Sequence, residues 1–566
     1  MLKFWQNPEF VRHFRSELRR TRAVSVLAVV VVLCILVGLG CWAQRDNVIA
    51  KARASAQASG QPTAAELEFM EQRNPIEFWR LYYRTLMMGQ VGILSFWVLF
   101  ACAQSVSQER ERKTWDFQRT TRLSPSELLT GKLLGEPVLA YFIVLCCIPI
   151  SIFAGLRGET GFLHIIYAYT LILSSALFLG LVGIWLSSMF ESRSRGVGVL
   201  AALGLYALVS IAATFSETMF PGVAAISPFS GLDSLLSFGR GPMPPTLFSH
   251  KTPWVVMSLL LYITFGAWFV LMIVRNLKKD PDELRMLSRW QVVGCVAFLN
   301  FLAYGLFDPE RTTDITMTDF ATLMVGLNTL ILALMGLATL TPHERLKVWW
   351  RRNHSKPAGI FAEDGLPWPW LAISAVIAYC LMIWGLSAWK SALGYNPKAF
   401  QSGAIQLLAI LIFITRDVLF IQWCTLTRMR APTLKGMLFL GLYYVATVVI
   451  TIVLSIGSDQ TGHHFANLLT PAGIFEHFDG FSFAASVFVG MALQLAVIMF
   501  LLMVIKRRLA PSHDSGGSCR LVPVTVDLFL DGPNVFGFRL HWVNMHHPPK
   551  HLRHEPPTGS IAIFLS

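Results

Sequence analysis

The chain has 566 residues, of which 54% are hydrophobic and only 14% are charged. An ordinary soluble domain is about 25% charged, so this composition argues against a soluble enzyme. Lys and Arg outnumber Asp and Glu by 47 to 34, which gives a formal net charge of +13.

Long uncharged stretches predict the fold class. A membrane-spanning helix needs roughly 20 apolar residues, whereas a spanning strand needs about 10 in alternation with polar ones, so we exclude a β-barrel. We expect an all-α polytopic membrane protein with about 12 transmembrane helices, the first retained because it is too long for a signal-peptide core. The weakest candidates are 290–307 and 399–415. The stretches are 23–44, 85–108, 137–156, 160–190, 196–216, 252–274, 290–307, 320–343, 365–389, 399–415, 436–458 and 480–505.

The placement of basic residues predicts the orientation. With the N-terminus inside, the segments up to residue 508 that face the cytoplasm hold 31 of the 47 Lys and Arg residues. The positive-inside rule therefore predicts that both termini are cytoplasmic. Topology accounts for the basic excess, and because the basic residues form no platform interleaved with aromatic ones, we expect no nucleic-acid partner.

Residues 1–22 contain a basic amphipathic helix. Asn7 suits its N-cap and Pro8 its first position. We expect this helix to lie on the inner membrane surface, in contact with lipid. The alternative is an ordinary positive flank of the first span. The predicted interfacial residues are Phe10, Phe14, Leu18 and Arg19.

A charged segment follows the second span. Ser124 and Glu127 have the spacing of a capping box, so we predict a short helix that begins at Pro125. The residues before it mix both charges around Trp115 and Phe117, which we expect to be exposed. Such a surface suits a protein partner, and the alternative is a solvated loop.

Four motifs resemble those of ABC-2-type transporter permeases. They are Asn7–Leu18, Glu109–Asp116, Leu123–Lys132 and Ile226–Phe229, and their order along residues 1–280 matches that family. The usual family form of the second motif is Glu-Arg-Glu-x-Gly-Thr, and Lys113 replaces its Gly here.

The resemblance implies the membrane subunit of an exporter. In that family, an elbow helix and a coupling helix dock on a separate ATP-binding subunit, which holds ATP and Mg. This chain lacks a phosphate-binding loop, because Ser126 and Leu133 stand where Gly-x4-Gly-Lys-Ser/Thr needs Gly and Ser or Thr. We therefore expect no catalytic residue, no metal and no cofactor in this chain. By resemblance, the coupling residues are Glu109, Arg110, Glu111, Arg112, Leu123, Ser124, Pro125, Glu127 and Lys132.

We divide the chain into four segments. Residues 1–22 form the interfacial (elbow) helix, and 23–274 a six-span ABC-2-type permease unit. Residues 275–508 form a second membrane region of about six spans. It is either a degenerate repeat, in which Thr415–Asp417 ends a helix as Gln108–Arg110 does, or an accessory region of other origin. Residues 509–566 are expected to be a cytosolic, poorly ordered tail.

The sequence thus predicts the permease subunit of an ATP-driven exporter in a bacterial inner (cell) membrane. The alternative is a non-transporting membrane anchor or scaffold for a cytosolic complex. We find no carboxylate inside the apolar stretches, which argues against a proton-driven carrier. The substrate stays open, as does the choice between one chain that supplies both halves and a homodimer.

Overall fold

The structure is a computed structural model of the full chain. It describes residues 7–58, 64–120, 122–189, 204, 221–237, 244–248, 250–279, 287–307, 316–353, 361–389, 397–427, 432–457, 469, 481–509, 525–530, 536–541 and 560–564. Contacts divide the chain into two compact units, Met1–Arg507 and Arg508–Ser566.

Helices dominate the first unit. Its N-terminal half contains α1 (Pro8–Glu17), α2 (Arg20–Ala58), α3 (Ala64–Glu111), α4 (Trp115–Thr120), α5 (Pro125–Gly135), α6 (Val138–Arg157), α7 (Phe162–Met189), α9 (Pro221–Ala224), α10 (Pro228–Leu236), the hairpin of β1 (Thr246–Leu247) and β2 (His250–Lys251), and α11 (Trp254–Asn276). There follow α12 (Arg289–Leu306), α13 (Met317–Ala338), α14 (His343–Asn353), α15 (Trp368–Ala388), α17 (Pro397–Thr425), α18 (Pro432–Gly457) and α20 (Phe481–Leu509).

Among the described residues, ten helices are long and apolar enough to cross a membrane: α2, α3, α6, α7, α11, α13, α15, α17, α18 and α20. Each coincides with a predicted stretch, so the all-α polytopic membrane fold is confirmed. The stretch 290–307 forms α12, which is not apolar enough to count among the spans, because Arg289, Gln291 and Asn300 lower the mean hydropathy of its 18 residues. The predicted span 196–216 lies outside the described residues.

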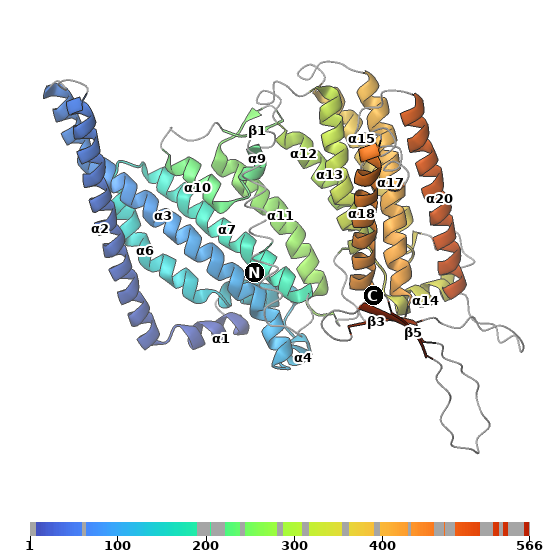
Figure 1. The fold of residues 1–566 in the computed structure, drawn as a ribbon. Helices are drawn as coiled ribbons and strands as arrows, with labels where there is room; N and C mark the ends of the chain where they lie inside the picture. Colours follow the sequence, from blue (N-terminus) through green and yellow to red (C-terminus); the bar gives the residue numbers. More distant parts are fainter. Residues whose placement is uncertain are drawn as a thin grey trace, which may run out of the picture. The chain divides into compact units, whose positions relative to one another are not determined.

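The N-terminal core is built around α3, which packs against α7, α6 and α2 (Figure 1). A glycine permits the close approach of α7 to α3. A Cβ on Gly183 of α7 would lie 2.9 Å from the carbonyl oxygen of Leu99 in α3. Polar residues inside the spans join neighbouring helices: Gln90 of α3 donates to Ser151 of α6 at 2.8 Å.

A second core joins α12, α13, α15 and α17. At its centre, Asn300 of α12 and Asn328 of α13 exchange two amide hydrogen bonds of 2.8 Å. Both side chains are fully buried, and each also donates to a carbonyl of its own helix. This pairing satisfies four polar groups that would be costly to bury alone.

The prediction that Thr415–Asp417 ends a helix is wrong. α17 continues to Thr425, so Arg416 and Asp417 lie inside its apolar span. Arg416 pairs with Asp417 at 2.6 Å and donates to Gln494 of α20 at 2.8 Å and to Tyr443 and Tyr444 of α18 at 3.2 and 3.0 Å. The helix tolerates these charges because each has partners, and the expectation of no carboxylate within the spans is therefore also wrong.

The second unit contains one antiparallel sheet, ordered β3 (Thr525–Leu530), β4 (Phe536–His541) and β5 (Ser560–Phe564). β4 is central: Asp527 pairs with Arg539, and Arg539 pairs in turn with Ala562. The sequence analysis predicted no strand in this segment.

Candidate functional site

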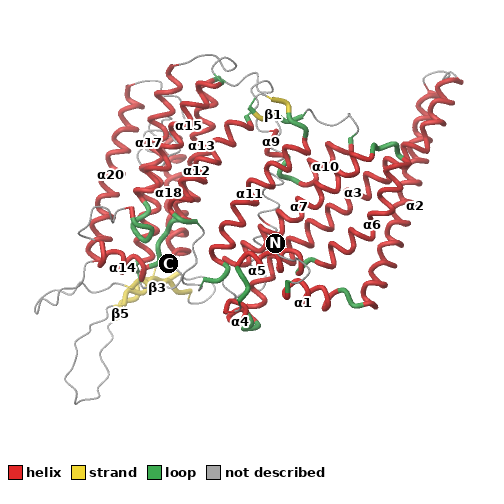
Figure 2. Tube along the Cα trace, turned by 180° about the vertical axis from the view of Figure 1, so that it is seen from behind, coloured by secondary structure: helices red, strands yellow, loops and turns green. Residues whose placement is uncertain are grey.

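Three short helices gather at the C-terminal end of α3. They are α1, α4 and α5, and Figure 2 shows them together below the long helices. We call the site formed by α1, the last turn of α3, α4 and α5 the elbow cluster. It contains most of the residues that the sequence predicts for coupling.

The start of α1 is fixed by Asn7, a buried residue. Its side-chain oxygen accepts a hydrogen bond from the backbone N–H of Glu9 at 3.0 Å, and Pro8 holds the first helical position. The Asn7 amide also donates to the backbone carbonyl of Glu127 in α5 at 2.7 Å. The predicted N-cap is therefore confirmed, and the same side chain ties α1 to α5.

Two glycines let α1 pack directly on α5. Gly131 and Gly135 are four residues apart and therefore share one face of the helix. A Cβ at Gly131 would lie 2.8 Å from the Cβ of Glu9 and 2.9 Å from Oδ1 of Asn7. One at Gly135 would lie 3.3 Å from the side chain of His13, a milder contact. The observed packing at Gly131 therefore requires a residue without a side chain.

Glu109, in the last turn of α3, is buried, and side chains from all three short helices contact its carboxylate. Its carboxylate accepts hydrogen bonds from Gln118 of α4 at 2.6 Å and from Arg12 of α1 at 3.1 Å. It also pairs with Lys132 of α5. One carboxylate thus connects a long membrane helix to all three short helices.

Lys132 is the fully buried cation of the cluster. Besides Glu109, its Nζ lies 3.8 Å from Oε1 of Glu9 and 5.7 Å from the centre of the Trp115 ring. Two carboxylates and an aromatic face offset the cost of burying the ammonium group. Loss of either ionic partner would leave a buried charge poorly compensated.

Two carboxyl groups beside Lys132 have shifted pKa values. Burial alone would raise the pKa of Glu9, but a hydrogen bond with His13 and the charges of Lys132 and Arg12 lower it below its ordinary value. Burial raises the pKa of Glu136, and the charges of His13, 3.6 Å away, and Lys132 oppose this rise only in part. Glu9 is therefore ionised at neutral pH and balances Lys132.

The turn between α3 and α4 is a Schellman motif centred on Lys113. The N–H of Thr114 donates to the carbonyl of Glu109 at 3.0 Å, and the N–H of Lys113 donates to that of Arg110 at 3.1 Å. Lys113 has a φ of 58°, in the left-handed region that favours glycine. The position where this sequence departs from the family's Gly is therefore one where the backbone favours Gly.

One side of α4 is exposed and the other is buried. Phe117 is 75% exposed, and Glu111, Arg112 and Asp116 around it are exposed as well. Trp115 is buried, so the prediction that it is exposed is wrong. It lies under Lys132 and Arg110, whose positive charges the ring face attracts.

The structure places the predicted coupling residues in three settings. Glu109 and Lys132 face inward, so they can affect a partner only by holding the helices in place. Arg110 donates to the carbonyl of Ser188 in α7 at 3.1 Å. Glu111 and Arg112 are exposed.

The start of α5 contains the remaining predicted coupling residues, Leu123, Ser124, Pro125 and Glu127, all partly buried. Ser124 and Glu127 form the predicted capping box: the N–H of Ser124 donates to the Glu127 carboxylate at 2.7 Å, and the N–H of Glu127 donates to the Ser124 hydroxyl at 3.2 Å. The backbone and side-chain hydrogen bonds from Ser124 lower the pKa of Glu127.

Of the predicted interfacial residues, Phe10 is buried and its ring lies 5.9 Å from that of Phe14, which is exposed. Leu18 is the C-cap of α1 and Arg19 is exposed. α1 ends here and α2 begins at Arg20, so the elbow is a separate helix.

Sequence reasoning missed the contributions of Arg12, His13 and Gln118 to the site. The contact between Arg12 and Glu109 alone joins residues 97 positions apart, and no local pattern records such pairs. The four-residue spacing of Gly131 and Gly135 was the available signal, since it predicts a helix face on which another helix can pack closely.

Within the described part of the chain, no group of three or more His, Cys, Asp and Glu residues is placed to hold a metal ion. Residues 459–468 and 470–479, with their histidines, and the tail histidines other than His541 lie outside the described residues. For His541 the structure describes only the backbone.

Residues 43–273 match the family model described as ABC-2 family transporter protein. No curated protein and no solved structure matches the chain. The matched range covers the end of α2, all of α3 to α7, and nearly all of α11, and therefore includes the elbow cluster apart from α1. This multi-pass membrane protein thus contains, in its N-terminal half, a region that is similar to ABC-2 family transporter proteins.

Proposed function

We propose that this protein is the permease subunit of an ATP-driven exporter, and that a separate ATP-binding subunit docks on its elbow cluster. The observation that carries the proposal is the ABC-2 match over 43–273, and within that range α4 exposes an aromatic side chain, Phe117. An exposed aromatic within mixed charges is typical of a protein-binding surface.

The contacts of the cluster suggest how docking would act on the membrane helices. A partner that pushes on α4 would contact Phe117, Glu111 and Arg112. Because Gln118 of α4 and Lys132 of α5 both bind Glu109, displacement of either short helix would move the end of α3. Nucleotide-driven closure of the partner could thereby reorient the spans.

We further propose a bacterial inner membrane location with both termini and the elbow cluster in the cytoplasm. The excess of Lys and Arg in the segments assigned to that side supports this orientation. ATP and Mg would be held by the partner, because the motif around Gly131 and Lys132 lacks the residues of a phosphate loop.

Affinity purification of the full chain from its native membrane tests the proposal. We expect a stoichiometric ATP-binding subunit to co-purify, and its yield to fall at least about tenfold when Phe117→Ala removes the exposed aromatic anchor, an effect of the size expected of an interface hot spot. The matched control is Phe162→Ala. Phe162 is 62% exposed, but it lies at the start of α7, at the end of this helix away from the elbow cluster.

The outcomes separate the two hypotheses for this protein. Retention of some other soluble complex without an ATP-binding subunit would support the membrane scaffold instead. An ATP-binding subunit that stays bound to the Phe117→Ala variant would show that docking does not use this surface. ATPase stimulation by transported solute would distinguish an exporter from a scaffold, which should show none.

A further inference from the structure

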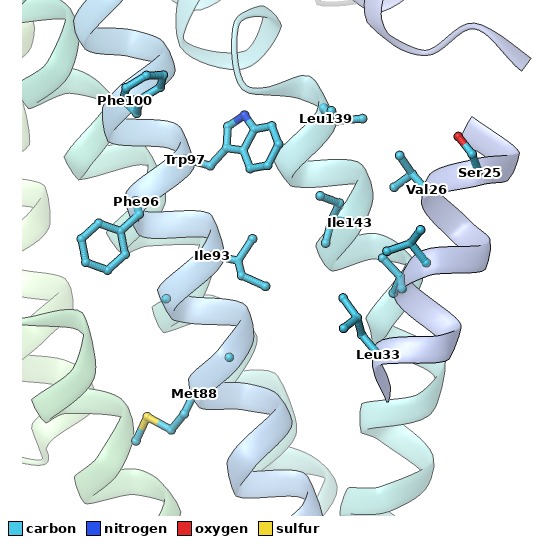
Figure 3. Close-up of a pocket in the computed structure, with 14 residues that line it drawn as sticks. Ser25, Val26, Leu33, Met88, Ile93, Phe96, Trp97, Phe100, Leu139 and Ile143 are labelled. Carbon is cyan, nitrogen blue, oxygen red and sulfur yellow. The ribbon is translucent and has the colours of Figure 1, made fainter. Parts of the chain in front are cut away.

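An apolar cavity lies between α2, α3 and α6 (Figure 3). Its volume is about 1000 Å³. Ser25 supplies the one polar side chain among the described lining residues, at the end of the cavity nearest α1. In Figure 3, Ile93 and Trp97 point from α3 toward Ile143 on α6.

Two glycines on α3 create this space. Gly89 has no atom within 4 Å of the position where a Cβ would lie, and the nearest such atom at Gly92 is 3.7 Å away, on Phe229. The walls are open at the side, since Leu33 is 50% exposed and Trp97 is 42% exposed. Because α2, α3 and α6 are membrane-spanning candidates, an opening between them faces the bilayer.

Basic residues lie next to the apolar lining at the end of the cavity where Ser25 lies. Arg22, Ser25 and Val29 follow one another at helical spacing on α2, so Arg22 lies one turn beyond the apolar lining. Arg15, Arg19 and Arg20 are exposed at the same α1–α2 junction.

The charge at this junction is not neutralised within the described part of the chain. Glu17 pairs with Arg22 at 3.1 Å. Arg15, Arg19 and Arg20 have no carboxylate within ion-pair distance among the described residues. An apolar cavity open to lipid, with surplus cations at one end, is complementary to an amphiphile with an anionic head.

We propose that the cavity is a binding site for one anionic phospholipid, with an acyl chain between α2, α3 and α6 and its phosphate at Arg22 and at Arg19, one helical turn before it. Guanidinium groups bind phosphate through two parallel hydrogen bonds, which an apolar solute or a zwitterionic lipid uses less well. The site does not depend on the exporter proposal, because it requires no ATP-binding subunit.

Native mass spectrometry of the full purified chain tests this site, with equimolar phosphatidylglycerol and phosphatidylcholine in mixed micelles. We expect one retained lipid per chain, with phosphatidylglycerol preferred. The double variant Arg19→Gln with Arg22→Gln should reduce that preference about thirtyfold, the effect of two basic residues near an anionic surface. Its matched control is Arg351→Gln with Arg352→Gln, because these exposed arginines lie on α14.

A second variant tests the cavity without changing charge. Gly89→Leu places a side chain in open space and should abolish retention of both lipids, whereas Gly441→Leu, an equally open position on α18, should not. Equal retention of the two lipids by the native chain, or unchanged retention by Gly89→Leu, would overturn the proposal. A lipid-free native dimer that Gly89→Leu converts to a monomer would instead assign this face to a second copy.

Discussion

Replacing Lys132 with Met removes the buried cation of the elbow cluster while preserving the approximate length of the side chain. The substitution leaves two carboxylates, Glu109 and Glu9, without their shared partner. Loss of one member of a buried ion pair costs about 3–5 kcal/mol. Arg12 and Gln118 still hydrogen-bond Glu109, so we expect the lower end of that range.

The expected effect is local, because the ion pair joins α5 to α1 and α3. A loss of about 3 kcal/mol corresponds to a roughly 150-fold increase in the local opening equilibrium. Hydrogen–deuterium exchange on the full chain in lipid nanodiscs measures that equilibrium. Exchange should accelerate in 8–17 and 125–135, while α13 and α15 stay protected.

A second substitution separates charge from packing. The double variant Glu109→Gln with Lys132→Met contains neither charge of the buried pair. Its loss of local stability should therefore be smaller than the sum of the losses in the two single variants, by a coupling free energy of about 1 kcal/mol or more. Lys435→Met, an exposed position on α18, is the control for losing a Lys. Unchanged exchange in Lys132→Met, or strict additivity in the double variant, would refute the ionic account of the cluster.

Three further predictions concern the same site. Gly131→Ala should destabilise the packing of α1 on α5 by about 1–3 kcal/mol, as expected for overpacking, and Gly135→Ala should destabilise it less. Protease sensitivity measures the release of α1, and equal sensitivity of the two variants would contradict the packing argument. Lys113→Gly should stabilise the α3–α4 turn by about 0.5–1 kcal/mol, because relief of a left-handed residue exceeds the entropy cost of Gly, and slower exchange in 109–120 would show it. The pKa of Glu9 is lowered in the folded protein, so its stabilising contribution is complete above its unfolded pKa of about 4.3 and is lost as pH falls through the folded value. Opening of α1, corrected for intrinsic exchange, should therefore increase in acid in the native chain and less so in Glu9→Gln.

Local signals in the sequence were sufficient to locate the described spans and the caps of α1 and α5. Apolar run length located all ten described spans, and residue identity at helix ends located Asn7, Ser124 and Glu127 as caps. These features depend on residues within a few positions of one another, which is why one sequence records them.

Contacts between distant residues account for the errors. Arg416 and Asp417 end an uncharged stretch, so run length placed a helix boundary there. The helix continues because Gln494 and two tyrosines, 27 to 78 residues away, accept hydrogen bonds from Arg416. Burial of Trp115 likewise depends on Lys132, which no local pattern brings next to it.

The same contacts bear on how the elbow cluster would transmit force. Glu109 and Lys132 resembled docking residues, yet they are buried, whereas Phe117 is the exposed aromatic. A partner on Phe117 would move α4, and the hydrogen bond from Gln118 to Glu109 would carry the movement into α3, where Lys132 holds the Glu109 carboxylate in place. A rigid connection of this kind requires the buried charges to be fully partnered. The variant Lys132→Met should therefore uncouple partner ATPase activity from transport before it abolishes docking, and loss of both together would indicate that the two residues form part of the docking surface.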